Sequence, residues 1–289
     1  MRSEPFGFIN VGLPYGKPMY EGIVSDPYTR IGWNGLEAGR GLPIDIHVPA
    51  AAQIPGMPDT DGTIVIFDRT TLMGTQLRKY TWGAGRPTAS SGIQTSFIGL
   101  GHPASPTGSA REGPSASGTS VIFGLIRGFE ICTPGYPIEH ITEMFMPGKG
   151  DTRFHVLLNR EWMWPANGHD GFCDSGSHGR SCTGPIKYGQ LLAIPRNIDL
   201  TALGLTEPGY RMAVSWQRYG VRVNDDGAPV GMRADQDLAL CSDKKNELLN
   251  DIRNKLYPLL RAVLNDSQDQ AASGGGNPIA PNCAIDASR

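Results

Sequence analysis

Short apolar segments, each ended by glycine, proline or polar residues, recur along this chain of 289 residues. They include TIVIF at 63–67, SVIFGLI at 120–126, RFHVLL at 153–158 and YGQLLAIP at 188–195. Runs this short are typical of strands, because helices usually need about 10 residues or more. The chain has 38 glycines, 23 prolines and only 19% charged residues, so turns must be frequent. The pattern predicts an all-β fold, a β-sandwich or jelly roll with long loops.

The clearest strand signal is a predicted hairpin near residue 70. An apolar run from Thr63 to Phe67 meets a turn-like segment, and a second run ends at Trp82. We expect this hairpin to bring Asp68 and Gln76 near its turn.

A single strong helix pattern covers residues 243–264. Ser242 or Asp243 can cap its start, and Pro258 should kink or divide it. An apolar stripe of the kind that packs on a core consists of Leu248, Leu249, Ile252, Leu256, Leu259, Leu260 and Val263. Farther upstream, GYRMAVSWQRYGVRVNDDG at 209–227 fits a helix, a strand or both.

The expected organisation has three parts. Residues 1–240 form the β-sandwich domain, and residues 241–266 form one C-terminal amphipathic helix packed on it. Residues 267–289, which are rich in glycine and polar residues, form a flexible tail.

The five cysteines fit no zinc-ribbon spacing. Cys173 and Cys182 flank a short Gly/Ser-rich loop, which favours a local disulfide. A zinc site with His169 and His178 is the alternative, as are two free thiols. Cys241 and Cys283 can tie down the tail, which leaves Cys132 without a partner. We therefore expect an oxidising compartment and no metal.

Charge and motif content exclude several classes of protein. A formal net charge of −2 and a pI of about 6.3 give no footprint for nucleic acid. No apolar run approaches the roughly 18 residues of a membrane span, and no signal peptide is visible at the start. Nucleotide-binding, G-x-S-x-G and H-E-x-x-H motifs are missing from the sequence. We expect a secreted or extracytoplasmic protein with no cofactor, no nucleic-acid partner and no membrane partner.

Two tryptophans suggest a sugar-binding surface. Trp162 and Trp164 alternate along a predicted strand, so their rings should face the same side. Exposed indoles offer a flat apolar platform for a sugar ring, although burial of both in the core is the alternative. Pro165 should end the strand and leave His169 at the rim.

Glycoside hydrolysis requires two carboxyl groups, about 5–5.5 Å apart for retention or about 6.5–9.5 Å apart for inversion. The acidic residues beside apolar segments are Asp68, Glu130, Glu139, Glu143, Asp225 and Asp226. No spacing singles out a pair. We select Asp68 and Asp225 as the catalytic pair, with Glu139 and His140 beside them and His140 tuning one carboxyl group.

The leading hypothesis is an extracellular glycoside hydrolase that cuts a polysaccharide or oligosaccharide in an aromatic-lined groove. The expected substrate-binding residues are Trp162, Trp164, Tyr80, Tyr219, His169 and Arg127. A non-catalytic glycan-binding or surface-structural protein is the first alternative. A polysaccharide lyase would use His140, Tyr188, Tyr219 and Arg127, with the arginine neutralising a uronate. A metal enzyme centred on His140, His155 or His169 is the last alternative.

Six segments in the same order resemble a largely uncharacterised group of secreted bacterial jelly-roll-like proteins taken to be carbohydrate-active. They span roughly residues 62–227 and read VIFDRTTLMGTQLRKY, SASGTSVIFGLIRGFEI, PIEHITEMF, WMWPANGHDG, YGQLLAIPRNIDL and WQRYGVRVNDDG. The resemblance implies a jelly-roll fold, export and glycan handling.

The chain departs from the pattern of this group at three places. Gln76 stands where the group has a Glu in the second hairpin strand. Glu139 and His140 replace an Asp-His pair, and Asp225-Asp226-Gly227 replaces Asp-Asn-Gly. If the missing Glu is essential in the group, Gln76 implies altered chemistry or none.

Overall fold

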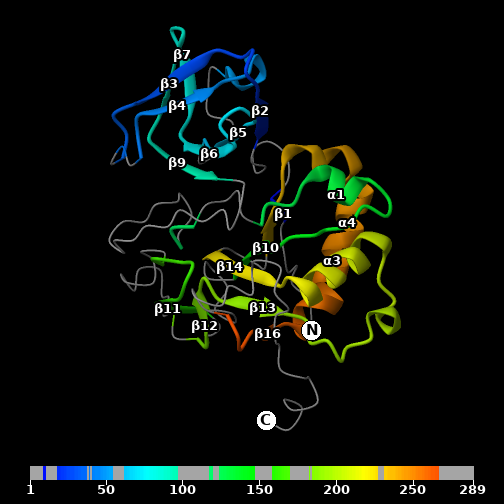
Figure 1. Cartoon of the computed structure of the whole chain (residues 1–289). Coiled ribbons are helices and arrows are strands. Elements are labelled where there is room, and N and C mark those ends of the chain that lie inside the picture. Colours follow the sequence, from blue (N-terminus) through cyan, green and yellow to red (C-terminus); the bar gives the residue numbers. More distant parts are fainter. Residues whose placement is uncertain are drawn as a thin grey trace, which may run out of the picture.

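The computed structural model describes residues 9–10, 18–37, 39, 41–54, 62–96, 117–119, 124–146, 158–169, 182, 184–226 and 231–266. These residues are arranged in two lobes (Figure 1), an N-terminal lobe of strands and a C-terminal lobe in which helices cover a mixed sheet. The described protein is β-rich with few helices, as the sequence predicts. Its strands belong to four separate sheets.

The N-terminal lobe contains two four-stranded sheets. The first has the order β2 (Met19–Gly22), β5 (Ile64–Asp68), β6 (Met73–Arg78) and β9 (Ser91–Ser96). The second has the order β4 (Ile44–His47), β3 (Tyr28–Trp33), β8 (Arg86–Ala89) and β7 (Thr81–Gly83). A short 3-10 turn, η1, covers Ala50–Ala52.

Alternating side chains of β5 account for the packing of this lobe. Ile64 and Ile66 join the core of the lobe, whereas Val65 packs on Leu125 of the other lobe. The predicted hairpin is confirmed, since β5 and β6 pair antiparallel with Asp68 opposite Met73. The expected position of Gln76 near the turn is wrong. Gln76 pairs with Val65 in mid-strand, because the turn lies between Asp68 and Met73.

The C-terminal lobe is built on a six-stranded sheet that combines parallel and antiparallel pairs. Its order is β1 (Ile9–Asn10), β15 (Gly231–Arg233), β10 (Thr142–Met146), β14 (Val221–Asp226), β13 (Leu191–Ala193) and β16 (Arg261–Ala262). A separate parallel pair joins β11 (Leu158–Trp162) and β12 (Ile186–Tyr188).

Three of the described helices cover one face of this sheet (Figure 1): α1 (Gly128–Cys132), α3 (Glu207–Arg218) and α4 (Ser242–Asp251). Shorter helical turns are η3 (Leu200–Leu203), η4 (Gln236–Cys241), η5 (Ile252–Leu256) and η6 (Tyr257–Leu259). The ambiguous segment 209–227 contains both a helix, α3, and a strand, β14. None of the described helices is long and apolar enough to cross a membrane.

The predicted C-terminal helix is shorter than its apolar stripe suggested. Regular α-helix ends at Asp251 and continues as a π turn and then as a 3-10 turn containing Pro258. The expected interruption at this proline is confirmed, because proline cannot donate the backbone hydrogen bond that a helix interior needs. The proposed domain division at residue 240 stays a prediction.

A disulfide joins Cys132 of α1 to Cys241 of η4. The expectation that Cys132 is unpaired and that Cys241 bonds Cys283 is therefore wrong. The two cysteines meet because α1 packs on η4, a contact between elements far apart in the sequence. Cys182 is also disulfide-bonded. Since Cys173 lies outside the described residues, its predicted bond to Cys182 stays a prediction.

Candidate functional site

The two faces of the six-stranded sheet differ in chemistry. Met144, Val223 and Met232 point toward the helices and belong to the main apolar core. Residues one position away point to the opposite face, because side chains alternate along a strand. That opposite face carries Glu143, Asn224 and Arg233, which are only 3%, 1% and 7% exposed. Buried polar side chains of this kind need partners, and they form the candidate site.

A bulge in β14 brings two polar residues to the same place. The pairing of β10 with β14 shifts between Met144 and Phe145, so Asn224 is an extra residue in the ladder. A bulge re-aims side chains that would otherwise alternate. Asn224 donates to Glu143, and Asp225 forms an ion pair with Arg233. Both neighbours in sequence therefore reach the same cluster.

Two hydroxyl groups fix the orientation of the Asn224 amide. Ser117 and Thr119 each donate to Oδ1 of Asn224, and their own oxygen atoms are 2.7 Å apart. The amide nitrogen must then point the other way, where Nδ2 donates to Oε2 of Glu143. This chain of bonds holds the Glu143 carboxyl group in one orientation.

Burial raises the pKa of Glu143 to about 8. Arg233 and the Asn224 hydrogen bond favour the charged form but only partly offset the loss of water, and the negative charge of Asp225 opposes them. Glu143 is thus protonated at neutral pH. Asn224 and Arg233 both contact Oε2. No described residue forms a hydrogen bond with Oε1 of Glu143.

Arg233 joins Glu143 to a second carboxyl group. Its Nη1 is 3.5 Å from Oε2 of Glu143, and its Nη2 is 3.0 Å from Oδ2 of Asp225. Because one guanidinium contacts both oxygens, their separation stays below the upper limit of about 9.5 Å for glycosidase pairs. Glu143 is enclosed, whereas the Asp225 side chain is 18% exposed. One group is therefore placed to act as an acid and the other as a carboxylate.

The predicted tryptophans lie beside this cluster but contact different partners. Trp162 ends β11, is 50% exposed and stacks on His169 with ring centroids 5.5 Å apart. Trp164 lies beyond the strand, and the guanidinium of Arg222 is 5.4 Å from its ring centroid. Arg222 is the residue of β14 opposite Glu143. The segment also reaches the cluster through Asn167, whose backbone N donates to Ser117 O at 2.9 Å.

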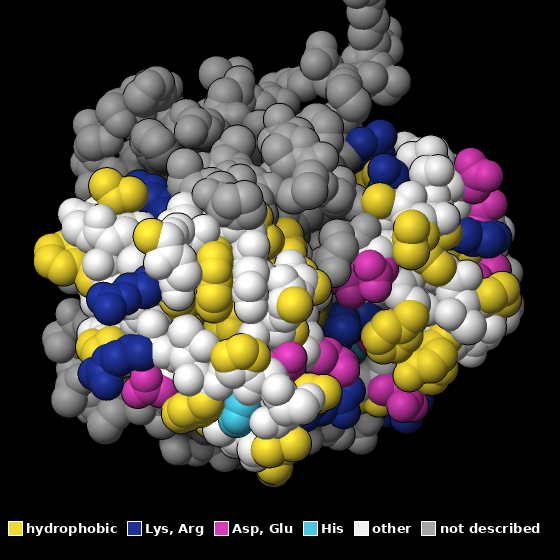
Figure 2. Space-filling model, turned by 90° about the horizontal axis from the view of Figure 1, so that it is seen from above, with side chains coloured by type: hydrophobic (Ala, Val, Ile, Leu, Met, Phe, Trp, Pro, Cys, Tyr) yellow, Lys and Arg dark blue, Asp and Glu magenta, His cyan; other side chains and the backbone are white. Residues whose placement is uncertain are grey.

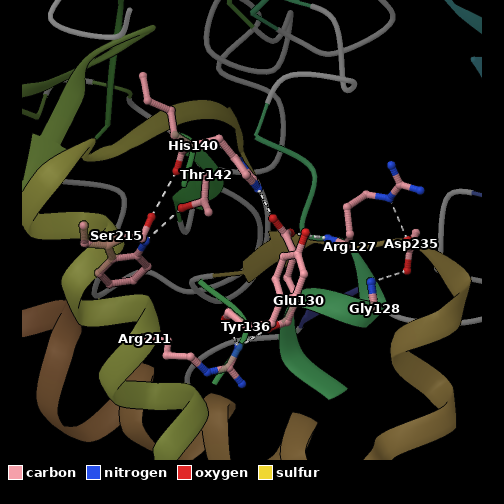
Figure 3. Close-up of polar contacts among 11 residues, drawn as sticks. Arg127, Gly128, Glu130, Tyr136, His140, Thr142, Arg211, Ser215 and Asp235 are labelled. Carbon is pink, nitrogen blue, oxygen red and sulfur yellow. Dashed lines mark hydrogen bonds and ion pairs between the residues drawn. The ribbon is translucent and has the colours of Figure 1, made fainter. Parts of the chain in front are cut away.

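A second polar group surrounds α1 at the edge of the sheet (Figure 3). His140 places Nε2 2.8 Å from Oε1 of Glu130 and Nδ1 2.7 Å from the carbonyl of Ile141. Burial lowers the pKa of His140, but the bond to Glu130 and its charge raise it by more. Since both ring nitrogens face acceptors, a charged ring donates both bonds. Arg211 donates to three carbonyls, of Glu130, Ile131 and Tyr136, and thereby caps α1.

The other predicted residues lie apart from the carboxyl pair. Asp68 is fully buried at the end of β5, in the N-terminal lobe, and is not brought together with Asp225. Tyr80 is also fully buried, and its hydroxyl donates to Ala52 O at 2.9 Å. Tyr219 packs beside Arg218, and Glu139 is exposed. Among the described residues no group of three or more His, Cys, Asp or Glu could hold a metal ion.

Glu143 is one of the candidate acids in the sequence, but it is not in the catalytic pair predicted from the sequence. The signal was an acidic residue in the middle of the apolar strand TEMFM at 142–146. A carboxyl group at such a position is buried, and burial shifts its pKa upward. No family model, no curated protein and no solved structure matches the chain. The resemblance carried by the six sequence segments stays a prediction.

Proposed function

We propose that the protein is an extracellular glycoside hydrolase that degrades a polysaccharide, with Glu143 as general acid and Asp225 as second carboxylate. The observation that carries this proposal is the buried Glu143, with its pKa raised to about 8, sharing Arg233 with Asp225. Two carboxyl groups in unlike surroundings are the arrangement that acid/base cleavage of a glycosidic bond needs.

In this mechanism Glu143 gives its proton from Oε1 to the glycosidic oxygen as the bond to the sugar breaks. Asp225 stabilises the positive charge that develops on the sugar ring, either by attacking the ring or by activating a water molecule. Arg233 contacts both carboxyl groups, and Asn224 engages Oε2 of Glu143, which leaves Oε1 to give the proton. Trp162 and His169 offer a stacked, partly exposed surface for a neighbouring sugar unit.

Glu143 takes the place of Asp68 in the pair for a physical reason. The oxygens of Asp68 accept bonds from the backbone N and Nδ1 of His47 and from the backbone N of Thr70 and Thr71. Burial alone would raise the pKa of Asp68, but these bonds lower it below its usual value. A fully bonded, ionised carboxylate has no proton to give.

The charge on the surface also lacks the large basic patch that binding of nucleic acid would need. On the face drawn in Figure 2, described Lys and Arg side chains alternate with Asp and Glu, and no large patch of one sign gathers there. The disulfide is compatible with an extracellular protein. Export, the jelly-roll arrangement and membership of the resembling group are further parts of the proposal.

The test is release of reducing ends from a panel of polysaccharides. We expect Glu143→Gln and Asp225→Asn each to lower kcat by about 100- to 10,000-fold. The matched control is Glu247→Gln, because Glu247 is a partly exposed residue of α4 whose one ion pair among the described residues is with Lys244. Circular dichroism and thermal unfolding of each variant establish that it is folded.

Three outcomes would contradict the mechanism. Activity of folded Glu143→Gln at the wild-type level would remove the general acid. Polysaccharide binding without any product over long incubation would favour the non-catalytic glycan-binding protein. Unsaturated products that absorb in the near ultraviolet would show a lyase instead.

A further inference from the structure

An arginine at the junction of the two lobes is clamped between two aromatic rings. Arg127 directly precedes α1, and its Cζ is 5.4 Å from the ring centroid of Phe67 in β5. It is also 5.4 Å from the ring centroid of Phe129 in α1. One ring comes from each lobe. Both rings are within the range of a cation–π contact with the guanidinium group.

A buried carboxylate fixes the direction in which the guanidinium group points. Nε of Arg127 donates to Oδ2 of Asp235 at 3.0 Å, and Asp235 is only 1% exposed. Asp235 is held in turn by the backbone N of Gly128 at 2.7 Å and of Asp237 at 3.1 Å. The terminal nitrogens, Nη1 and Nη2, point away from this network (Figure 3). No described residue accepts a hydrogen bond from either of them.

The nearby carboxylates are already engaged. Glu130 uses Oε2 to accept from the backbone N of Arg127 and Oε1 to accept from His140. The two terminal nitrogens of a planar guanidinium can each donate a hydrogen bond to one oxygen of a carboxylate. Because the Arg127 side chain is already held in place, less conformational entropy is lost when the anion binds. The Arg127 side chain is 30% exposed, so an incoming anion can reach it.

Arg127 is connected to the catalytic carboxyl groups through one stretch of chain. Arg233 contacts Glu143 and Asp225, and Asp235, two residues later, contacts Arg127. Residues two apart in extended chain point to the same side and are separated by about 7 Å. The segment before Arg127 touches the other end of this arrangement, since Glu143 N donates to Gly124 O at 3.0 Å. The spacing between these two backbone positions, about 7 Å, is comparable to the length of a sugar unit.

We propose that Arg127 binds the carboxylate of a uronic acid unit next to the cleaved bond, so that the substrate is an acidic polysaccharide. This inference rests on the proposed function, because the catalytic pair defines where the neighbouring sugar lies. Two parallel N–H···O bonds hold the uronate, and Phe67 and Phe129 keep the guanidinium in the plane that makes both bonds possible. No covalent step involves Arg127.

The test measures binding in the absence of turnover. Glu143→Gln protein is titrated by calorimetry with oligouronates and with the same oligomers after their carboxyl groups are reduced to alcohols. We expect Arg127→Gln, added to Glu143→Gln, to weaken oligouronate binding at least 10-fold and to leave binding of the reduced oligomers unchanged. Arg127→Lys keeps the charge but not the paired donors, and it should recover only part of the affinity.

Arg30→Gln is the matched control, because Arg30 is an exposed arginine in β3 paired with Asp45. A sulfated neutral oligomer forms a separate arm, and tighter binding of it than of the oligouronates would overturn the choice of carboxylate. Equal oligouronate affinity with and without Arg127, or no oligouronate binding at all, would overturn the inference while leaving hydrolysis of neutral polymers possible. Arg127-dependent binding with no cleavage by the wild-type protein would support the inference and reject the hydrolase.

Discussion

Asp68 and Glu143 are both buried carboxyl groups, and their surroundings move their pKa values in opposite directions. Burial penalises the charge of each. In Asp68 the bonds from His47, Thr71 and Thr70 outweigh that penalty and lower the pKa. In Glu143 the contacts with Arg233 and Asn224 do not outweigh it, and the pKa rises to about 8. Neighbouring donors, which a linear sequence does not display, therefore decide which carboxyl group holds a proton.

Replacing Asp68 with Asn should destabilise the fold. The folded-state pKa of Asp68 lies below its unfolded value, so its stabilising effect is present above the unfolded pKa and is lost as the pH falls through the folded pKa. We expect Asp68→Asn to reduce the free energy of unfolding at pH 7 by about 1–3 kcal/mol, measured by urea denaturation. Asp45→Asn is the control, because Asp45 is partly exposed. Equal stability of the two variants would contradict the assignment.

Glu143 should make the protein less stable as the pH rises. Its folded-state pKa is about 8, above the unfolded value, so its contribution is complete below the unfolded pKa and declines until the pH passes the folded pKa. Glu143→Gln has no proton to lose at this position. Relative to wild type, we expect the variant to gain a few kcal/mol on going from pH 5 to pH 8. Urea denaturation at both pH values measures this difference, and parallel pH profiles would argue against a buried acid.

The sequence predicted part of the site for reasons that can be traced to single residues. Asp225 was selected, and Glu143 was among the candidate acids, because both stand beside apolar strand segments. The sequence does not rank Asp68 against Glu143, because no spacing singles out a pair. The choice depended on burial and on Arg233, which comes from a strand about 90 residues farther along the chain. Spacing in the sequence carries no such information.

At the level of elements, helices α3 and α4 approach each other closely at Gly209, which has no side chain. A Cβ atom at Gly209 would lie 2.1 Å from Oδ2 of Asp251. Asp251 is fully buried and accepts from the backbone N and the hydroxyl of Thr206, at 2.7 and 2.6 Å. Thr206 caps the start of α3, so α4 contributes directly to the way in which α3 begins.

Gly209→Ala should therefore destabilise the protein, although alanine is normally more favourable than glycine within a helix. We expect the added methyl group to separate the helices and to cost about 1–3 kcal/mol, seen as a lower Tm. Gly83→Ala is the control, because a Cβ atom there meets nothing within 4 Å. An unchanged or higher Tm for Gly209→Ala would show that the two helices do not approach so closely.

Sequence patterns predicted the elements whose structure depends on nearby residues. The β5–β6 hairpin follows from alternation across a short turn, and the end of the C-terminal helix follows from Pro258. The six-stranded sheet could not be predicted in the same way. Its strands have two to six residues, and β10 pairs with β14 across an intervening α3 and β13. Segments so short gain their partners from tertiary packing rather than from their own propensity.

At the level of the whole molecule, the two lobes meet through a small apolar contact. Met19 and Val65 of the N-terminal lobe pack with Leu125 of the C-terminal lobe, and Phe67 lies beside them. The chain also crosses between lobes more than once. Strand β1 belongs to the C-terminal sheet, although it precedes β2 of the N-terminal lobe. Arg127, between Phe67 and Phe129, lies at this junction, so both lobes shape the proposed uronate position.

Cys132 and Cys241 are 109 residues apart, and the disulfide between them closes the intervening chain into a covalent ring. Glu143, Asp225 and Arg233 all belong to the chain inside this ring. A single break in the backbone between the cysteines leaves both pieces attached to each other through sulfur. A break in one loop therefore does not separate the three residues into two molecules.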